Sequence, residues 1–412
     1  MIDRVRTIYE LTEKHHAWRR SCLNLVAAEA ATSPLVETLL ASDFSRRYSS
    51  KGVYAGDKYF VQIYEIVTEL AKSLFGAKYA ELRPVTGNMT VLACVTGLTQ
   101  PGDTIMTIGP IYGGYPLRMA EWAGISVIYH PFDPVRMNIK VEQAYDKILT
   151  VRPTLIVFGA SEYLFPHPVE ALAEAAREVG ATIYYDGSHV MGLIAGSEFQ
   201  DPFSEGANLL AGSTHKTLPG PQRGLILTND EEIYEKISNV FDSPPFLQSC
   251  YHLNTLVALG VALAECKQFG QQFATQIVKN ARALAKALDE EGVSVLAAEY
   301  GYTRSHQVIL ENEGFASPRG FEIKAKLEEC GILVDAVVRL GVQEVTRLGM
   351  KEAEMQQIAS LIADVIQERR PTDKVREDAR GLAANHRKMH FSFQDGEETG
   401  ALGIWRQRRR RM

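Results

Sequence analysis

Short, largely apolar segments alternate with helical patterns from about residue 62 to residue 290. Several of these segments are unbroken apolar runs, which predict strands that are buried on both faces. Strands separated by helices in this way are typical of the α/β class, with a mostly parallel sheet covered on both faces. The expected strands are Thr104–Ile108, Ser126–Tyr129, Thr154–Phe158, Thr182–Tyr185, Leu209–Ala211 and Gly224–Leu227.

The helical patterns continue beyond this sheet. One spans Val169–Glu178 and is followed by Gly180, a residue suited to the left-handed turn that ends a helix. A longer pattern, Leu256–Glu291, leads into a smaller α+β domain. In that domain we expect strands at His306–Leu310 and Val337–Leu340 and a closing helix at Lys351–Glu368.

The length of 412 residues favours two globular units over one ordinary core. We expect an N-terminal arm at residues 1–30, with an amphipathic, charged helix over residues 1–20. A large domain would follow at residues 31–290, then a small domain at 291–370 and a polar tail at 371–412. The tail ends in four arginines, Arg408 to Arg411, and a basic terminal run is usually a solvated, mobile end.

Composition narrows the class of protein. Hydrophobic residues make up 46% and charged residues 23%, as in soluble globular proteins. A net charge of −6 gives no reason to expect nucleic acid or an anionic membrane as a partner. The five scattered cysteines form no CxxC pair, which argues against a disulfide framework or a metal site. With a charged N-terminus and no apolar run of membrane-spanning length, the sequence predicts a cytoplasmic enzyme.

Two residues at the ends of neighbouring strand candidates suggest a chemistry. Asp186 follows the strand at 182–185, and Lys216 follows the strand at 209–211 in the sequence Ser213-Thr214-His215-Lys216. In open parallel sheets, ligands bind at the carboxyl ends of the strands. A carboxylate that pairs with a pyridinium nitrogen and a lysine that condenses with an aldehyde are the groups that pyridoxal 5'-phosphate needs. Either residue alone is more often a helix cap or a solvated amine, so the prediction rests on the pair.

A phosphate cradle precedes the pair. Residues 84–89, Pro-Val-Thr-Gly-Asn-Met, open the apolar helix expected at Thr90–Leu98. Small and hydroxyl residues at a helix start offer backbone N–H groups and the positive end of the helix dipole to an anion.

These motifs resemble serine hydroxymethyltransferase. Residues 186–195, Asp-Gly-Ser-His-Val-Met-Gly-Leu-Ile-Ala, and residues 213–221, Ser-Thr-His-Lys-Thr-Leu-Pro-Gly-Pro, are similar to that family's aspartate–histidine segment and lysine motif. Further matches are Glu29 with residues 32–34, residues 74–77, residues 101–105, Gly113-Gly114, and the stretch from Arg339 to Gly349. The resemblance covers roughly residues 20 to 368.

The resemblance implies the aspartate-aminotransferase-like fold of pyridoxal-phosphate enzymes (fold type I) and a homodimer with a shared active site. It implies Lys216 as the Schiff-base lysine and Asp186 on the pyridine nitrogen. His189 would contact the phenolic oxygen, with Ser161 nearby. The remaining cofactor-binding residues would be Thr86, Gly87 and Asn88 at the phosphate, Tyr115 against the ring, and Ser213 and His215 beside the lysine.

The substrate side is implied in the same way. Arg339 would clamp the carboxylate of an α-amino acid, work suited to a planar guanidinium. Tyr48 would come from the neighbouring subunit, both as a catalytic residue and as a substrate contact. Tyr59 falls roughly where the family has paired tyrosines, and Glu29 completes the set.

The chain departs from the family at the second substrate. Ser50 stands where the family has an acid–base glutamate, Ala28 and Ala30 replace a serine and an asparagine, and Tyr115 replaces a stacking histidine. The segment Gln248-Ser249-Cys250 lacks the family's Gly-Gly step. Residues 332–339 are too few to contain the asparagine-rich loop that binds folate. The cofactor and amino-acid groups remain, while the folate groups do not.

Several reactions of an external aldimine stay open. We place first a specialised, folate-independent reaction of secondary metabolism, namely β-elimination or decarboxylation-coupled deamination of a cysteine S-conjugate. Homologues recruited to antibiotic pathways, such as the lincosamide pathway, resemble the chain in this respect. Threonine aldolase or transaldolase chemistry comes second and folate-dependent serine hydroxymethyl transfer third. A non-catalytic pyridoxal-binding module is the alternative outside enzymes.

Overall fold

The computed structural model describes residues 2–50, 53–243, 247–311 and 317–396. The chain divides into two compact units. The central unit is residues 35–275, and the terminal unit combines residues 1–34 with residues 276–412. Helix α10, Leu253–Glu290, has residues in both units. The Arg-rich end expected to be solvated lies outside the described residues.

The central unit is built on a sheet in which seven strands are described, in the order β2-β10-β9-β8-β7-β3-β4. Strand β10 runs antiparallel to both of its neighbours, and the pairs from β9 to β4 are parallel. The prediction of a mostly parallel α/β sheet is therefore confirmed, and each expected strand is present with ends within about two residues. The strands are β2 Tyr79–Glu81, β3 Thr104–Thr107, β4 Ser126–Tyr129, β7 Leu155–Phe158, β8 Thr182–Asp186, β9 Leu209–Ser213 and β10 Gly224–Thr228.

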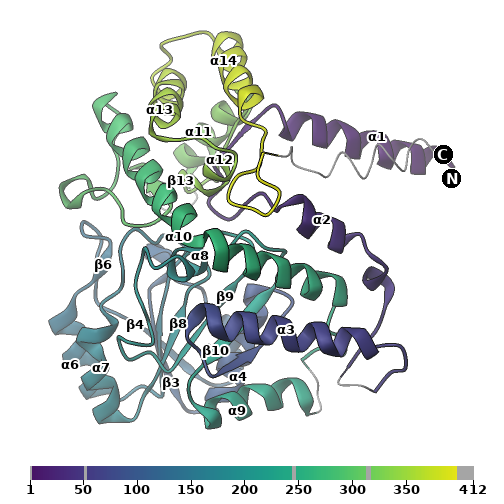
Figure 1. Ribbon diagram of the computed structural model, residues 1–412. Helices are drawn as coiled ribbons and strands as arrows, with labels where there is room; N and C mark the ends of the chain where they lie inside the picture. Colours follow the sequence, from purple (N-terminus) through teal and green to yellow (C-terminus); the bar gives the residue numbers. More distant parts are fainter. Residues whose placement is uncertain (1, 51–52, 244–246, 312–316, 397–412) are drawn as a thin grey trace. The chain divides into compact units, whose positions relative to one another are not determined.

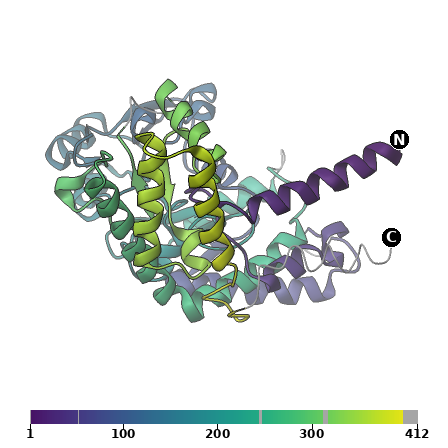
Figure 2. The ribbon, with the colours of Figure 1, turned by 90° about the horizontal axis from the view of Figure 1, so that it is seen from above.

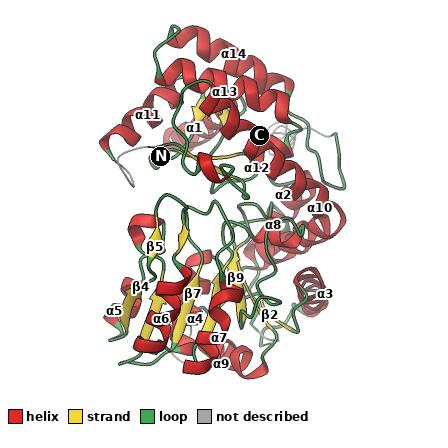
Figure 3. Ribbon diagram, turned by 90° about the vertical axis from the view of Figure 1, so that its left-hand side faces the viewer, coloured by secondary structure: helices red, strands yellow, loops and turns green. Residues whose placement is uncertain are grey.

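Helices lie beside these strands: α6 and α7 are to the left of the sheet in Figure 1, and α3 crosses in front of it. Figure 3 shows α4, α6 and α7 next to the strands from another side. Short elements complete the unit: the 3₁₀ turns Asp43–Arg46 and Pro110–Tyr112 and the hairpin of β5 Phe132–Asp133 with β6 Asn138–Ile139. The helices are α2 Pro34–Leu40, α3 Lys58–Phe75, α4 Gly87–Leu98, α5 Arg118–Trp122, α6 Val141–Val151, α7 Val169–Val179, α8 Met191–Ala195 and α9 Glu231–Asp242.

The core lies between the sheet and the helices α4 and α9. Helix α9 begins where the Asp230 side chain accepts a hydrogen bond from the backbone of Ile233 at 3.1 Å. Its buried residues Ile233, Ile237 and Phe241 recur every four positions, so they form one apolar stripe. This stripe packs with Val91 of α4 and with residues from five strands in one buried cluster. The cluster fixes the start of α4 relative to the strand ends.

The terminal unit joins the first residues of the chain to its last third. Strand β1, Leu23–Asn24, pairs in parallel with β12, Ile332–Leu333. Strands β11, Gln307–Ile309, and β13, Arg339–Gly341, pair antiparallel, in agreement with the two strands expected there. Helix α1, Ile2–Arg19, has no buried residue, and it extends away from α13 and α14 in Figure 2. The other elements are the 3₁₀ turn Ala298–Tyr300, α11 Pro318–Glu329, α12 Gln343–Arg347, α13 Glu352–Ile366 and α14 Thr372–Asn385.

Helix α14 occupies part of the segment expected as a polar tail. Its side chains Val375, Ala379 and Leu382 are buried, and it lies beside α13 in Figure 2. A polar helix with one narrow apolar stripe therefore belongs to the packed part of this unit. Within the described ranges, no helix is both long and apolar enough to cross a membrane.

Candidate active site

Five of the expected cofactor residues lie at or just after the carboxyl ends of β8 and β9: Asp186, His189, Ser213, His215 and Lys216. The two strands are parallel neighbours, with Asp186 opposite Ala211. Beyond them, the backbone of Ser213 donates to the Ser188 hydroxyl at 3.2 Å, and the Ser213 hydroxyl donates to the Ser188 carbonyl at 3.3 Å. These bonds join the two strand ends, so the segments that follow Asp186 and Ser213 lie side by side.

Asp186 is held at the end of its strand. Its Oδ1 accepts the backbone N–H of Ser188 at 2.9 Å. Tyr115 lies near enough for electrostatic coupling: burial, and then the charge of Asp186, raise the pKa of the Tyr115 hydroxyl. The Tyr115 ring also packs against the buried core cluster. The structure thus brings Tyr115 and Asp186 into one neighbourhood, as the expected ring contact requires.

Lys216 lies in a loop whose two ends are fixed. Thr214 donates its backbone N–H to the Arg223 carbonyl at 3.0 Å and its hydroxyl to the Pro221 carbonyl at 2.7 Å. Arg223 is fully buried, and its guanidinium donates to the carbonyls of Leu82 at 2.6 Å and Tyr251 at 2.9 Å. The loop is therefore closed on itself and anchored in the interior.

The middle of this loop is tied to the segment after Asp186. The Thr217 hydroxyl donates to the His189 carbonyl at 2.9 Å and accepts the backbone N–H of Gly192 at 3.0 Å. Thr214 and Thr217 are buried, whereas His215 and Lys216 between them are partly exposed. The loop therefore presents Lys216 from a rigid base, beside the segment that carries His189.

The residues expected to form the phosphate cradle lie at the start of α4. Thr86 precedes the helix, and its hydroxyl accepts the backbone N–H of Met89 at 3.2 Å. A Cβ on Gly87 would lie 3.1 Å from the Cβ of Ser213 and 3.6 Å from Oγ of Ser188. The absence of a side chain at Gly87 thus leaves the helix start open toward the two serines. Asn88 is exposed at the same turn.

Ser161 lies on a third loop, which follows β7. Its backbone N–H donates to the Gly113 carbonyl at 2.6 Å, which joins this loop to the segment that carries Tyr115. The loop is also held at its start, where the backbone N–H of Gly159 donates to Nδ1 of His167 at 3.1 Å. Burial, and secondarily the nearby His130, lower the pKa of His167 to about 3, so this ring stays neutral and Nδ1 remains an acceptor.

His167 belongs to a buried network that sequence reasoning missed. Its backbone N–H donates to Oε1 of Gln200 at 3.1 Å, and the same oxygen accepts the Tyr185 hydroxyl at 2.6 Å. The hydroxyls of Tyr163 and Tyr185 lie 2.5 Å apart. Nothing in the local sequence marks these residues, because the network joins segments far apart in the chain.

The two tyrosines expected on the substrate side make contacts within their own segment. Tyr48 is 42% exposed, and its ring lies edge-on to Tyr54 at a centroid distance of 4.7 Å. Tyr59, on α3, is 68% exposed with the Lys58 ammonium above its ring. The contacts described for these rings do not include the Lys216 loop. For Tyr48 this is compatible with the expectation that it serves a neighbouring subunit.

Glu29 and Arg339 belong to the terminal unit. One oxygen of Glu29, Oε2, accepts Nδ2 of Asn24 at 2.9 Å and pairs with Arg19. Glu344 is close to the same groups, and burial, together with the charge of Glu29, raises the pKa of its carboxyl to about 7 against the opposing effects of Asn24 and Arg19.

Arg339 begins β13, and its side chain is 10% exposed. It donates through Nη2 and Nε to Oδ2 of Asp335 at 2.8 and 3.1 Å. Sequence reasoning did not assign a role to Asp335.

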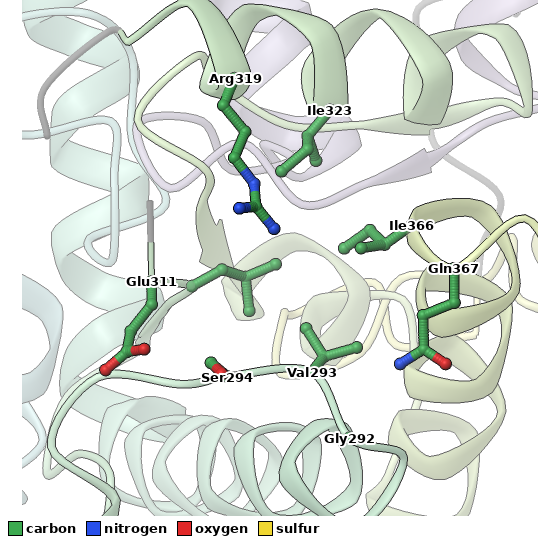
Figure 4. Close-up of a pocket in the computed structure, with 9 residues that line it drawn as sticks. Gly292, Val293, Ser294, Glu311, Arg319, Ile323, Ile366 and Gln367 are labelled. Atoms are coloured by element: carbon green, nitrogen blue, oxygen red, sulfur yellow. The ribbon is translucent and has the colours of Figure 1, made fainter. Parts of the chain in front are cut away.

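A cavity of about 460 Å³ also lies in the terminal unit, between the turn after α10 and the helices α11 and α13. Figure 4 shows its apolar wall, with Val293, Ile323 and Ile366, and the Arg319 guanidinium directed toward it. Neither Glu29 nor Arg339 lines this cavity. The candidate site is therefore supported by strand ends and loop contacts, and this cavity adds nothing to it.

The residues around Lys216 fit pyridoxal phosphate in their chemistry. The N–H groups at the start of α4 and the hydroxyls of Thr86 and Ser213 suit a phosphate group, and the open side of Gly87 allows its approach. The strand-end carboxylate of Asp186 suits a protonated pyridine nitrogen. Fold and site together define a pyridoxal-phosphate-dependent enzyme of fold type I.

Comparisons with known proteins give the family. A family model described as serine hydroxymethyltransferase matches residues 2–362. The serine hydroxymethyltransferase of Methanocaldococcus jannaschii is 41% identical over 96% of this chain and 97% of its own length. That of Thermococcus kodakarensis is 40% identical over 93% of this chain and 95% of its own. The chain belongs to the serine hydroxymethyltransferase family.

A solved structure agrees in fold. L-threonine transaldolase from Pseudomonas fluorescens, solved in its internal aldimine state, superimposes with a TM-score of 0.88. It is 26% identical, and the match covers 98% of this chain and 97% of the transaldolase chain. The expected fold, the pyridoxal phosphate cofactor and an enzymatic activity on amino acids are therefore confirmed.

Proposed function

We propose that the protein makes or breaks the Cα–Cβ bond of a β-hydroxy-α-amino acid and does so without folate. Cleavage would convert such an amino acid into glycine and an aldehyde. The Cα–Cβ bond breaks, the β-hydroxyl loses its proton as the carbonyl forms, and a proton is returned to the α-carbon. The names of the relatives support the choice of the Cα–Cβ bond, because serine hydroxymethyl transfer and threonine transaldolation both take place at that bond.

This reaction stood second on sequence grounds and now comes first. β-Elimination and decarboxylation-coupled deamination of a cysteine S-conjugate use the same cofactor, but none of the relatives named above is named for either reaction. The proposal of a role in secondary metabolism therefore receives no support from the comparisons.

The observation that carries the proposal of folate independence is the turn before Arg339. Strand β12 ends at Leu333 and β13 begins at Arg339, so only a short turn joins them. Within this turn Asp335 contacts Arg339 directly. Such a turn has no room for a binding loop. The absence of the acid–base glutamate at Ser50 supports the same conclusion, and there the Ser50 carbonyl accepts the backbone N–H of Val53.

The proposed roles follow the geometry. Lys216 would hold the cofactor covalently, and the start of α4 would bind its phosphate. Asp186 would keep the pyridine nitrogen protonated, with Tyr115 beside the ring. When bound, the cofactor supplies an electron sink for the substrate's α-carbon. Arg339 would bind the substrate carboxylate through its planar guanidinium.

We also propose that the protein is a homodimer. The resemblance assigns Tyr48 to the active site of a partner subunit, and the exposed rings of Tyr48 and Tyr54 are available for that contact. Light scattering on the purified protein should give twice the chain mass of 45.7 kDa. A monomer that retains full activity would contradict this proposal.

Product analysis tests the reaction. The holoenzyme is incubated separately with serine, threonine and a cysteine S-conjugate, with and without tetrahydrofolate, and the products are identified by mass spectrometry. We expect glycine and the matching aldehyde from the hydroxy amino acids, with no dependence on tetrahydrofolate. Lys216→Ala should lose this activity and the cofactor's visible absorption band. Pyruvate with ammonia, or carbon dioxide, would identify a different bond, and rapid formation of methylene-folate would contradict folate independence.

A further inference from the structure

Asp335 closes the turn that leads into Arg339. Its Oδ1 accepts the backbone N–H groups of Val337 and Arg339, each at 3.1 Å. Its carbonyl accepts the backbone N–H of Val338 at 3.0 Å. An aspartate that binds its own backbone two and four residues further on fixes the path of the chain. The position of the Arg339 backbone therefore depends on this carboxylate.

The second oxygen of the same carboxylate holds the side chain. Oδ2 of Asp335 accepts Nη2 of Arg339 at 2.8 Å and Nε at 3.1 Å. The side chains of Arg339 and Asp335 are only 10% and 22% exposed, so this pair differs from a solvated surface salt bridge. One carboxylate thus orients both the backbone and the guanidinium of Arg339.

The turn is held in a strained conformation. Val338 has a φ of +55°, in the left-handed region that β-branched residues rarely adopt. Leu310 donates its backbone N–H to the Val338 carbonyl at 3.2 Å, and Arg339 pairs with Ile309 across the strands. Such strain persists only where the surroundings determine the conformation, and it is common at ligand-binding sites. The strained residue here directly precedes the arginine.

We propose that Asp335 is a positioning residue for the amino-acid carboxylate: it holds the guanidinium of Arg339 in the orientation that binds this group. The inference rests on the proposed role of Arg339. An arginine side chain has many rotamers, and a fixed partner removes most of that freedom before the substrate arrives. Orientation in advance raises affinity for the carboxylate.

An Asp335 that competed with the substrate carboxylate for Arg339 would have the opposite effect on binding. A movable Asp335 that occupied the place of the substrate carboxylate would compete with it, and its removal would tighten binding. The contacts favour positioning, because both oxygens of Asp335 are engaged and one of them is bound by two backbone groups. A carboxylate held in this way is part of the turn.

The test measures ligand binding to the cofactor-loaded enzyme. Glycine and glycinamide are titrated into wild type, Asp335→Ala and Asp335→Asn, and the cofactor's visible spectrum gives each Kd. Asp335→Ala should weaken glycine binding by about tenfold or more. Glycinamide, which lacks the carboxylate, should bind within about twofold of wild type. Asp335→Asn should lie between, because its amide oxygen still accepts hydrogen bonds.

Asp133→Ala is the matched control. Asp133 also binds its own backbone, at Val135 and Arg136, but in an exposed turn of the central unit. It should leave both Kd values unchanged. Unchanged or tighter glycine binding in Asp335→Ala and Asp335→Asn would overturn the inference, as would equal losses for glycine and glycinamide.

Arg339→Ala separates the inference from the proposed function. If Arg339→Ala loses glycine binding while the Asp335 variants keep it, only the inference about Asp335 fails. If Arg339→Ala binds glycine normally, the proposed function loses its carboxylate site, and the role of Asp335 fails with it.

Discussion

Gly159 is the residue on which the approach of β7 to Asp186 depends. It has a φ of +123°, and a Cβ there would lie 2.3 Å from the carbonyl oxygen of Asp186. A contact of that length with a backbone atom cannot be relieved by a rotamer change. The loop that carries Ser161 can therefore leave β7 at this angle only because Gly159 has no side chain.

We predict that Gly159→Ala is far more harmful than Gly180→Ala. Gly180 also has a positive φ, +74°, but a Cβ there would meet nothing within 4 Å. Gly180→Ala should cost about 1–2 kcal/mol from conformation alone. Gly159→Ala should cost roughly 3 kcal/mol or more, since backbone strain and overlap add. Urea unfolding measures both, and equal losses would show that the contact with Asp186 is easily relieved.

At the scale of elements, the Ser161 loop is a unit fixed by the buried network of His167, Gln200, Tyr185 and Tyr163. The neutral ring of His167 accepts the Gly159 N–H, and Gln200 connects His167 to the hydroxyl of Tyr185. Every member depends on another, because a buried polar group without a partner is costly.

We predict that His167→Leu destabilises the protein by about 1–3 kcal/mol, because it leaves the buried Gly159 N–H without an acceptor. The cofactor's absorption band should shift as well, since the Ser161 loop moves. His167→Asn should recover most of both effects, because the asparagine oxygen reaches roughly the position of Nδ1. Urea unfolding and visible spectra test this. A leucine variant as stable as wild type would show that the N–H finds another partner.

The elements that sequence reasoning found are those with a strong local signal. Unbroken apolar runs such as Leu155–Phe158 predicted the strands, and the strand ends then located Asp186 and Lys216. Strands of two residues such as β1 and β12 have no periodicity to detect, and α14 is polar over most of its surface. Roles for His167 and Asp335 could not be predicted, because their partners are set by tertiary contacts or by a tight turn.

On the scale of the whole molecule, buried titratable groups set the dependence of stability on pH. Burial lowers the pKa of His130 and of His167 to about 3, below the ordinary value of 6.5. Their contribution to stability is present above pH 6.5 and is lost as pH falls toward 3, because only the unfolded chain binds these protons. Glu344, raised to about 7 from 4.5, contributes below pH 4.5 and loses its contribution as pH rises through about 7.

We predict that variants of His130 and Glu344 change the pH dependence of the free energy of unfolding in opposite directions. Below pH 6.5, His130→Phe should reduce the slope of the free energy of unfolding against pH by about 1.4 kcal/mol per pH unit, since one fewer proton is taken up on unfolding. Phenylalanine can keep the stacking that His130 makes on Phe158. Glu344→Gln should remove the decline in the free energy of unfolding between pH 4.5 and 7, because glutamine has no proton to lose there. Urea unfolding from pH 4.5 to 8 measures both, and unaltered slopes would contradict the assignment.

The pairing of β1 with β12 has a consequence for synthesis on the ribosome. Residues 35–275 form a continuous unit, so all of its parts have emerged before the terminal unit is complete. Leu23–Asn24, by contrast, gains its partner strand only when Ile332–Leu333 has been translated. During the translation of some three hundred residues, Leu23–Asn24 lacks the strand with which it pairs among the described residues. The terminal unit should therefore fold after the central unit. A ribosome stalled before residue 332 should hold a folded central unit with an unpaired N-terminal segment.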